Sequence, residues 1–112
     1  MKLILLEPRL LKYIDNINFR TDIQNLDDAD GIIFLCPKCL IENKGSIGTH
    51  SIICWFEDCV PDDIDPKPGR WTPQGHDLTD LTFVPGIKHQ AVSIKLTSGC
   101  MWHGFIRNGE VI

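Results

Sequence analysis

Two short residue pairs in this chain have the types and spacing of metal ligands. The first is Cys36 and Cys39 in "CPKC", and the second is Cys100 and His103 in "CMWH", far away along the chain. Together they offer three thiolates and one imidazole, a common closed ligand shell for zinc. Because each pair is tightly spaced, a single turn can present both of its side chains to one ion. The pattern predicts a structural zinc (Zn) site that joins two remote turns.

The second pair carries a geometric condition. Side chains alternate along a regular strand, so Cys100 and His103 would point to opposite faces if that segment were extended throughout. The prediction therefore requires a bulge or turn at residues 99–102, with a strand beginning only near His103. If the segment is extended, His50 is the reserve ligand.

Two other interpretations of the cysteines stay open. A C-x-x-C motif also serves redox chemistry, although no βαβ pattern surrounds this one. Unliganded cysteines can fill a core, but Pro37 and Lys38 place the first pair in a polar loop. The chain has five cysteines. An odd number, without a convincing export signal, favours a reducing compartment and metal binding over disulfides.

The remaining cysteines and histidines have less specific surroundings. Alternation in "THSIICWF" places Cys54 on the same face as Phe56, which predicts a core residue. Cys59 lies in an acidic loop, as an exposed thiol or an extra ligand. His50, His76 and His89 are candidates for acid–base chemistry. Since none stands beside a nucleophile motif, no catalytic residue is assigned.

A long connection and its tryptophans suggest a contact surface. Residues 57–77 are rich in Pro, Gly and Asp, and so long a connection in a small domain is usually functional or mobile. Trp71 within it, and Trp55 just before it, are the expected partner-binding residues because indoles are favoured at interfaces. In a small β domain both can equally belong to the core.

Charge and hydropathy narrow the function classes. The formal net charge is −4 and the Lys and Arg residues are scattered, so nucleic acid is not an expected partner. The longest apolar runs, "LILL" and "GIIFL", are far shorter than the roughly 20 residues that span a bilayer. Glu7, Pro8 and Arg9 interrupt the apolar N-terminus, so we expect a strand there and no signal peptide.

Strand signals dominate the chain. Runs of Val, Ile, Phe and Trp separated by Gly, Pro, Asn and Asp predict strands at 2–6, 31–35, 49–56, 81–84, 91–97, 103–107 and 110–112. Asn108-Gly109 suits a two-residue type I′ turn, which predicts a C-terminal β-hairpin. Residues 8–17 have a helical spacing of Leu and Ile over one or two turns, and residues 20–30 read as a connection.

These elements predict one mostly β domain over residues 1–112, built as a small β-sandwich or distorted barrel stapled by zinc. Residues 1–30 form an N-terminal strand and connection, and residues 31–112 form the zinc-stapled core.

Several blocks give the chain a resemblance to a small family of phage and prophage proteins. They are "FLCPKC", "GTHSIICWF", "PGRWTP", "LTFVPG" and "GCMWHGFIRNGEV", which follow one another from about residue 31 to residue 112. The resemblance implies a phage or prophage origin and Cys and His positions compatible with zinc. Members are sometimes labelled ammonia monooxygenase, but a membrane-embedded copper oxygenase subunit would need a spanning segment that this sequence lacks.

Two functions follow as expectations. The first is a phage accessory protein or minor virion component that acts as a protein-interaction module, in the host cytoplasm or the particle. The second is a small metal-dependent hydrolase or oxidoreductase with His50 or His76 at an open coordination position. A closed shell of four protein ligands supports the first, and three ligands plus water support the second.

Overall fold

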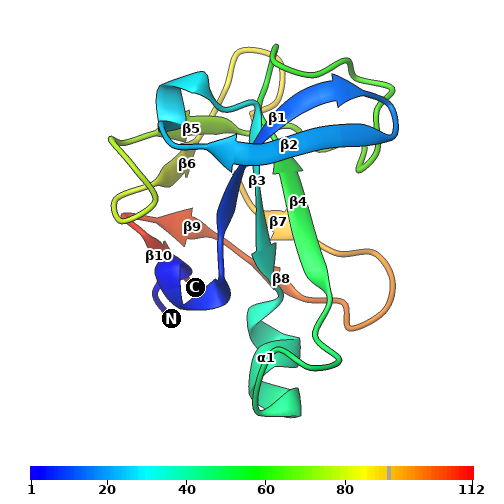
Figure 1. Ribbon diagram of the computed structural model, residues 1–112, viewed down its shortest axis with the longest axis vertical. Helices are drawn as coiled ribbons and strands as arrows, with labels where there is room; N and C mark the ends of the chain where they lie inside the picture. Colours follow the sequence, from blue (N-terminus) through cyan, green and yellow to red (C-terminus); the bar gives the residue numbers. More distant parts are fainter. Residues whose placement is uncertain (91) are drawn as a thin grey trace.

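An antiparallel sheet of four strands in the order β2-β1-β3-β4 forms the largest part of the structure (Figure 1). The computed structural model describes every residue except residue 91. The strands of this sheet are β1 Arg9–Asp15, β2 Asn18–Ile23, β3 Gly31–Leu35 and β4 Ser51–Trp55. Helix α1, Pro37–Asn43, follows β3 at the end of the sheet remote from the β1–β2 hairpin (Figure 1).

Three antiparallel strand pairs complete the described part of the chain. They are β5 Thr72–Gln74 with β6 Thr82–Val84, β7 Ile94–Lys95 with β8 His103–Gly104, and β9 Ile106–Arg107 with β10 Glu110–Val111. Two single-turn 3-10 helices are η1 Leu3–Leu6 and η2 Leu26–Asp28. The predicted mostly β class is confirmed. The strand predicted at 91–97 starts at a residue outside the described ones, and its described part contains β7.

The run "GIIFL" forms β3 because its residues fit a strand that is covered on both faces. Ile32 and Phe34 are fully buried in the main core, while Ile33 packs against a second cluster on the other face. Gly31 lies opposite Trp55 in the ladder. A Cβ at Gly31 would lie 2.7 Å from both the carbonyl oxygen of Cys54 and the indole of Trp55, so the close approach of β3 and β4 requires glycine there.

The predicted C-terminal hairpin is confirmed. Asn108 and Gly109 have φ values of 48° and 72°, as a type I′ turn demands, and they join β9 to β10. Gly109 donates its N–H to Leu81 O at 2.9 Å, and Leu3 donates to Gly109 O at 2.8 Å. The two ends of the chain therefore lie side by side (Figure 1).

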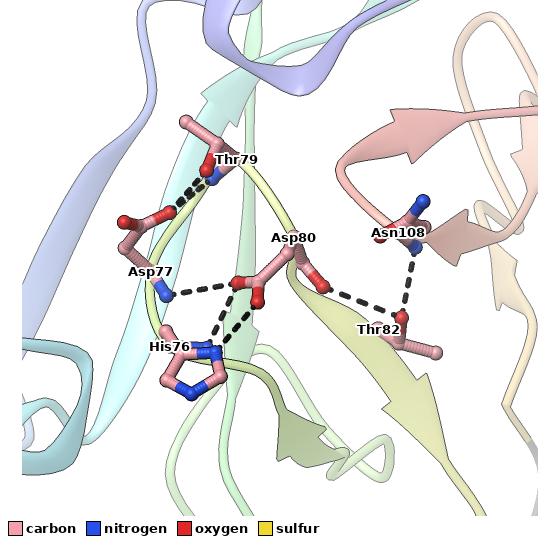
Figure 2. Close-up of polar contacts among 6 residues, drawn as sticks. All are labelled: His76, Asp77, Thr79, Asp80, Thr82 and Asn108. Atoms are coloured by element: carbon pink, nitrogen blue, oxygen red, sulfur yellow. Dashed lines mark hydrogen bonds and ion pairs between the residues drawn. The ribbon is translucent and has the colours of Figure 1, made fainter.

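A hydrogen-bonded turn supports this hairpin from the side. Asp80 accepts the N–H groups of His76 and Asp77 at 2.8 and 3.0 Å, which closes the turn (Figure 2). Thr82, just beyond it, accepts the N–H of Asn108 at 2.8 Å. The turn and the hairpin thus hold one another in place.

Three expectations for the N-terminal region were wrong. Residues 3–6 of the strand predicted at 2–6 form the 3-10 helix η1, because Leu3 and Leu6 stand one 3-10 turn apart and are both fully buried. The stretch with helical spacing contains β1. Residues 18–23 form its partner β2, so the first part of the connection predicted at 20–30 is a strand. Leu10 and Leu11 point to opposite faces of β1, into the two different apolar clusters. Pairing with strands on both sides overrides the weak helical pattern.

The long connection after β4 is organised by a single arginine. Arg70 is 1% exposed. Its guanidinium donates hydrogen bonds to the backbone carbonyls of Pro61, Ile64, Pro66 and Gly69. A buried charge is tolerated when it is hydrogen-bonded, so the "GRW" turn serves as the internal scaffold of this segment.

In the described part of the chain, no helix is both long and apolar enough to cross a membrane.

Candidate metal centre

The end of β3 and the first turn of α1 position the first two cysteines. Cys36 directly precedes the helix and is fully buried, and Pro37 occupies the first helical position, where its missing N–H costs nothing. Leu40 donates its N–H to Cys36 O at 2.9 Å, which closes the first helical turn. Cys39 lies on that turn, so its side chain is on the same side as that of Cys36. The expected loop is in fact the start of a helix.

The β3–β4 ladder places His50 beside Cys36. Cys36 donates its N–H to His50 O at 2.9 Å, which extends the antiparallel register by one pair beyond Leu35 and Ser51. Residues directly opposite on neighbouring strands have Cβ atoms about 4.5–5.5 Å apart. Strand pairing alone therefore brings this imidazole to the first thiol.

A tight turn between β7 and β8 supplies Cys100. Gly99 and Met101 have φ values of 64° and 61°, and Met101 donates its N–H to Ser98 O at 3.3 Å. The bend predicted at residues 99–102 is therefore present. Lys38 of α1 donates from Nζ to Cys100 O at 2.8 Å, which ties this turn to the helix.

Cys36, Cys39, His50 and Cys100 form a group that could hold a metal ion, and all their potential ligand atoms lie within 4.8 Å of one another. The Sγ atoms of Cys36 and Cys100 are 3.6 Å apart, and His50 Nε2 lies 3.4 Å from Cys100 Sγ. A tetrahedral ion with bonds of about 2.3 Å to sulfur and 2.0 Å to nitrogen needs separations of roughly 3.5–3.8 Å between its ligand atoms. The 3.6 Å spacing lies inside that range, and the 3.4 Å spacing lies about 0.1 Å below it.

The histidine and the burial of the group shift the pKa values of its thiols. The hydrogen bond with His50 lowers the pKa of the Cys100 thiol to about 7. Burial, together with the neighbouring Cys100 and Cys36, raises the pKa of Cys39 to about 12. Three thiolates in contact repel one another, so a cation among them would favour the deprotonated form of all three.

His103, the fourth ligand expected first, is not a member of this group. It is an exposed residue of β8, and its ring lies 5.9 Å from the ring of Phe105. The required turn is present and β8 begins at His103, but the imidazole that lies among the thiols is that of His50, which the β3–β4 register fixes. The reserve ligand His50 takes its place.

The other two cysteines lie outside the group. Cys54 is a fully buried core residue, as predicted, and burial raises the pKa of its thiol. Cys59 is exposed in the loop after β4 and is not an extra ligand of this group. All five cysteines are free thiols.

Two of the three histidines considered for acid–base chemistry, His76 and His89, fasten loops. His76 Nδ1 lies 3.0 Å from Asp80 Oδ2 (Figure 2), and this contact raises the pKa of the imidazole. His89 Nδ1 lies 3.5 Å from a carboxylate oxygen of Glu57. Within the described residues, no serine or cysteine is hydrogen-bonded to either ring, so neither forms a nucleophile–base pair.

The two tryptophans expected at a partner surface have different environments. Trp55 is 3% exposed and donates from Nε1 to Asp65 O at 3.0 Å, so it is a core residue and offers no surface to a partner. Trp71 is half-buried and stacks on Phe83 with ring centroids 5.8 Å apart. It also lines a cavity beside the metal group.

Sequence reasoning missed three residues that support this region. They are Lys38, which ties α1 to the Cys100 turn, Arg70, and Glu57, whose carboxylate accepts the N–H groups of residues 87–89. The only sequence signal for Arg70 was its place in the "PGRWTP" block.

Comparisons with protein-family models, with curated proteins and with solved structures find no match for this chain. Its fold and its site define the class: a small, mostly β protein with a three-cysteine, one-histidine group suited to a metal ion.

Proposed function

We propose that this protein is a zinc-stapled protein-interaction module of phage or prophage origin, acting as an accessory protein or a minor virion component. One observation carries the structural role of the metal: four protein side chains from three separate segments converge on a single point. Four protein ligands complete a tetrahedral zinc shell, whereas catalytic zinc keeps a position open for water or substrate.

Zinc is the ion that these ligands suit best. Thiolates are soft ligands that select zinc, copper(I) or iron–sulfur clusters, and a mixed sulfur and imidazole shell with tetrahedral spacing is typical of zinc. The spacings of 3.6 Å and 3.4 Å involving Cys100 Sγ agree with one ion in the centre of the group.

The metal would stabilise a fold that is divided into one four-stranded sheet and three separate strand pairs. It would join the β3–α1 junction, the start of β4 and the turn between β7 and β8. Structural zinc contributes on the order of 10 kcal/mol of gross binding free energy. That is comparable with the total free energy of unfolding of a typical domain, about 5–15 kcal/mol.

The alternative, a small metal-dependent enzyme, needs three protein ligands and a water molecule. The four-residue group supports the structural interpretation instead, and His76 lies on a turn outside it. The assignment to phage rests on the sequence blocks that run from "FLCPKC" to "GCMWHGFIRNGEV".

Metal analysis tests the proposal directly. Protein purified without added zinc should contain about one equivalent of zinc and should lose its fold cooperatively when a chelator removes the ion. A metal-free sample that remains stably folded would refute the structural zinc.

For the biological role, capture from infected or induced host cells with the wild-type protein as bait should recover a phage or host protein that a Trp71→Ala bait recovers poorly.

A further inference from the structure

The strand β4 has one free edge. It is the last strand of the sheet, and Phe56 donates its N–H toward the β3 side, to the residue preceding β3. Antiparallel pairing alternates, so the backbone groups of Ser51, Ile53 and Trp55 face the opposite side. The N–H of Trp71, bonded to Trp55 O at 3.0 Å, shows this directly. Beyond Trp55, the outward groups of Ser51 and Ile53 have no backbone partner among the described residues.

The strand β7 has a free edge as well. Leu96 donates its N–H to Trp102 O at 2.9 Å, and Ile94 pairs with Gly104, so these residues face β8. By the same alternation, the backbone N–H and C=O of Lys95 face away from β8. They too lack a backbone partner in the described part of the chain.

One groove lies between these two edges. A cavity of about 430 Å³ is lined by the consecutive residues 50–53 on one side and 94–100 on the other. Trp71 also lines it, and Cys39, His50 and Cys100 place the metal group against it. Two unpaired strand edges that face one hollow are the arrangement that accepts an added strand.

The lining of the groove is positively charged. Lys67 and Lys95 line it, and none of its described lining residues is Asp or Glu. Lys38 adds a third positive charge at Cys100. A zinc ion with three thiolates and a neutral imidazole carries a net charge of −1, so the groove stays positive in a protein whose formal net charge is −4. Trp71, Ile53 and Leu96 add apolar surface to the lining.

From these observations we infer that the groove between β4 and β7 binds an extended, acidic segment of a partner protein as an added β-strand. The segment's backbone pairs with the outward groups of Ser51, Ile53 and Lys95. Its carboxylates lie near Lys67 and Lys95, and an apolar side chain packs on Trp71. This inference rests on the proposed function as an interaction module and names the surface and the chemistry of its partner.

Blocked synthetic hexapeptides test the inference with the zinc-loaded protein. The probes are a panel that alternates aspartate with valine, leucine or phenylalanine, the same panel with lysine in place of aspartate, and the acidic panel with alternate amides N-methylated. In amide NMR spectra we expect an acidic probe to shift the signals of Ser51, Ile53, Lys95 and the Trp71 indole. We expect the lysine and N-methylated probes to bind at least about tenfold more weakly.

Protein variants supply the matched controls. Lys67→Glu combined with Lys95→Glu should weaken binding of the acidic probe by about tenfold or more, because two attractive pairs become repulsive. Lys2→Glu, at a residue that does not line the groove, should change binding of the acidic probe little. Failure of every acidic probe, equal binding of the lysine panel, or shifts confined to another surface would overturn the inference. So would a concentration-dependent dimer that protects Ser51 and Ile53 without peptide, since the occupant would then be a second copy. One equivalent of zinc and a captured partner alongside failed probes would reject this groove and leave the proposed function standing.

Discussion

The Sγ atoms of Cys36 and Cys100 lie 3.6 Å apart, although 64 positions separate the two residues in the chain. Cys36 directly follows the central strand β3, and Cys100 stands in a turn between two short strands of another sheet. Their approach links the main sheet to the C-terminal part of the fold. A metal ion between them would fix this link far more firmly than the surface ion pairs, which contribute only about 0–1 kcal/mol each.

Replacing Cys100 with serine should destabilise the protein strongly, because the metal would lose one ligand and with it the cross-link between sheets. We expect the melting temperature to fall by more than about 10 °C. Thermal unfolding followed by circular dichroism measures this. Cys59→Ser is the matched control, since Cys59 is an exposed thiol outside the group. Equal melting curves for both variants would contradict the site.

Separate substitutions of His50 and His103 decide which histidine is the fourth ligand. His50→Ala should lower retention of zinc during dialysis against a chelator at least about tenfold, whereas His103→Ala should retain it, because only His50 belongs to the group. His50→Cys should restore retention by supplying a fourth thiolate. If only the His103→Ala protein lost zinc, the fourth ligand would be His103, as the Cys100 and His103 pair first predicted.

Arg70→Lys should cost at least about 2 kcal/mol of unfolding free energy, because an ammonium cannot reach the four carbonyls that the buried guanidinium binds. Urea denaturation measures the change. The control is Arg20→Lys, which alters an exposed pair with Asp22 and should stay within about 0.5 kcal/mol of wild type. If the two variants were equally stable, Arg70 would not organise the connection.

Acid should weaken the attachment of residues 87–89. Burial raises the pKa of Glu57, but the N–H groups of His89, Lys88 and Ile87 outweigh it and lower the value from 4.5 to about 2. A carboxylate whose pKa is lower in the folded state than in the unfolded state stabilises the folded state at pH values above the unfolded-state pKa. This contribution is lost as the pH falls from about 4.5 to about 2.

Glu57→Gln should therefore destabilise the protein at pH 7, and the difference from wild type should shrink as the pH falls through that range. Denaturation at a series of pH values measures it. Glu42→Gln, on the exposed surface of α1, is the control and should show no such pH dependence. A constant difference between Glu57→Gln and wild type at all pH values would contradict the role of the ionised carboxylate.

Local sequence determined much of this protein. Short apolar runs between turn residues set the mostly β class, and Asn108-Gly109 set the terminal hairpin, because these signals act between neighbours on the chain. Three of the four members of the metal group were predicted first, from the spacing of Cys36 with Cys39 and of Cys100 with His103, and His50 was the reserve ligand.

Tertiary structure decided the rest. His50 rather than His103 joins the thiols because strand register, which is a pairing between distant segments, places it opposite Cys36. Residues 9–15 form a strand because β2 and β3 flank them, although their own spacing resembles a helix. The scaffold around Arg70 likewise depends on carbonyls that only the folded loop gathers. Each of these outcomes depends on long-range contacts, and no local pattern in the sequence encodes such contacts.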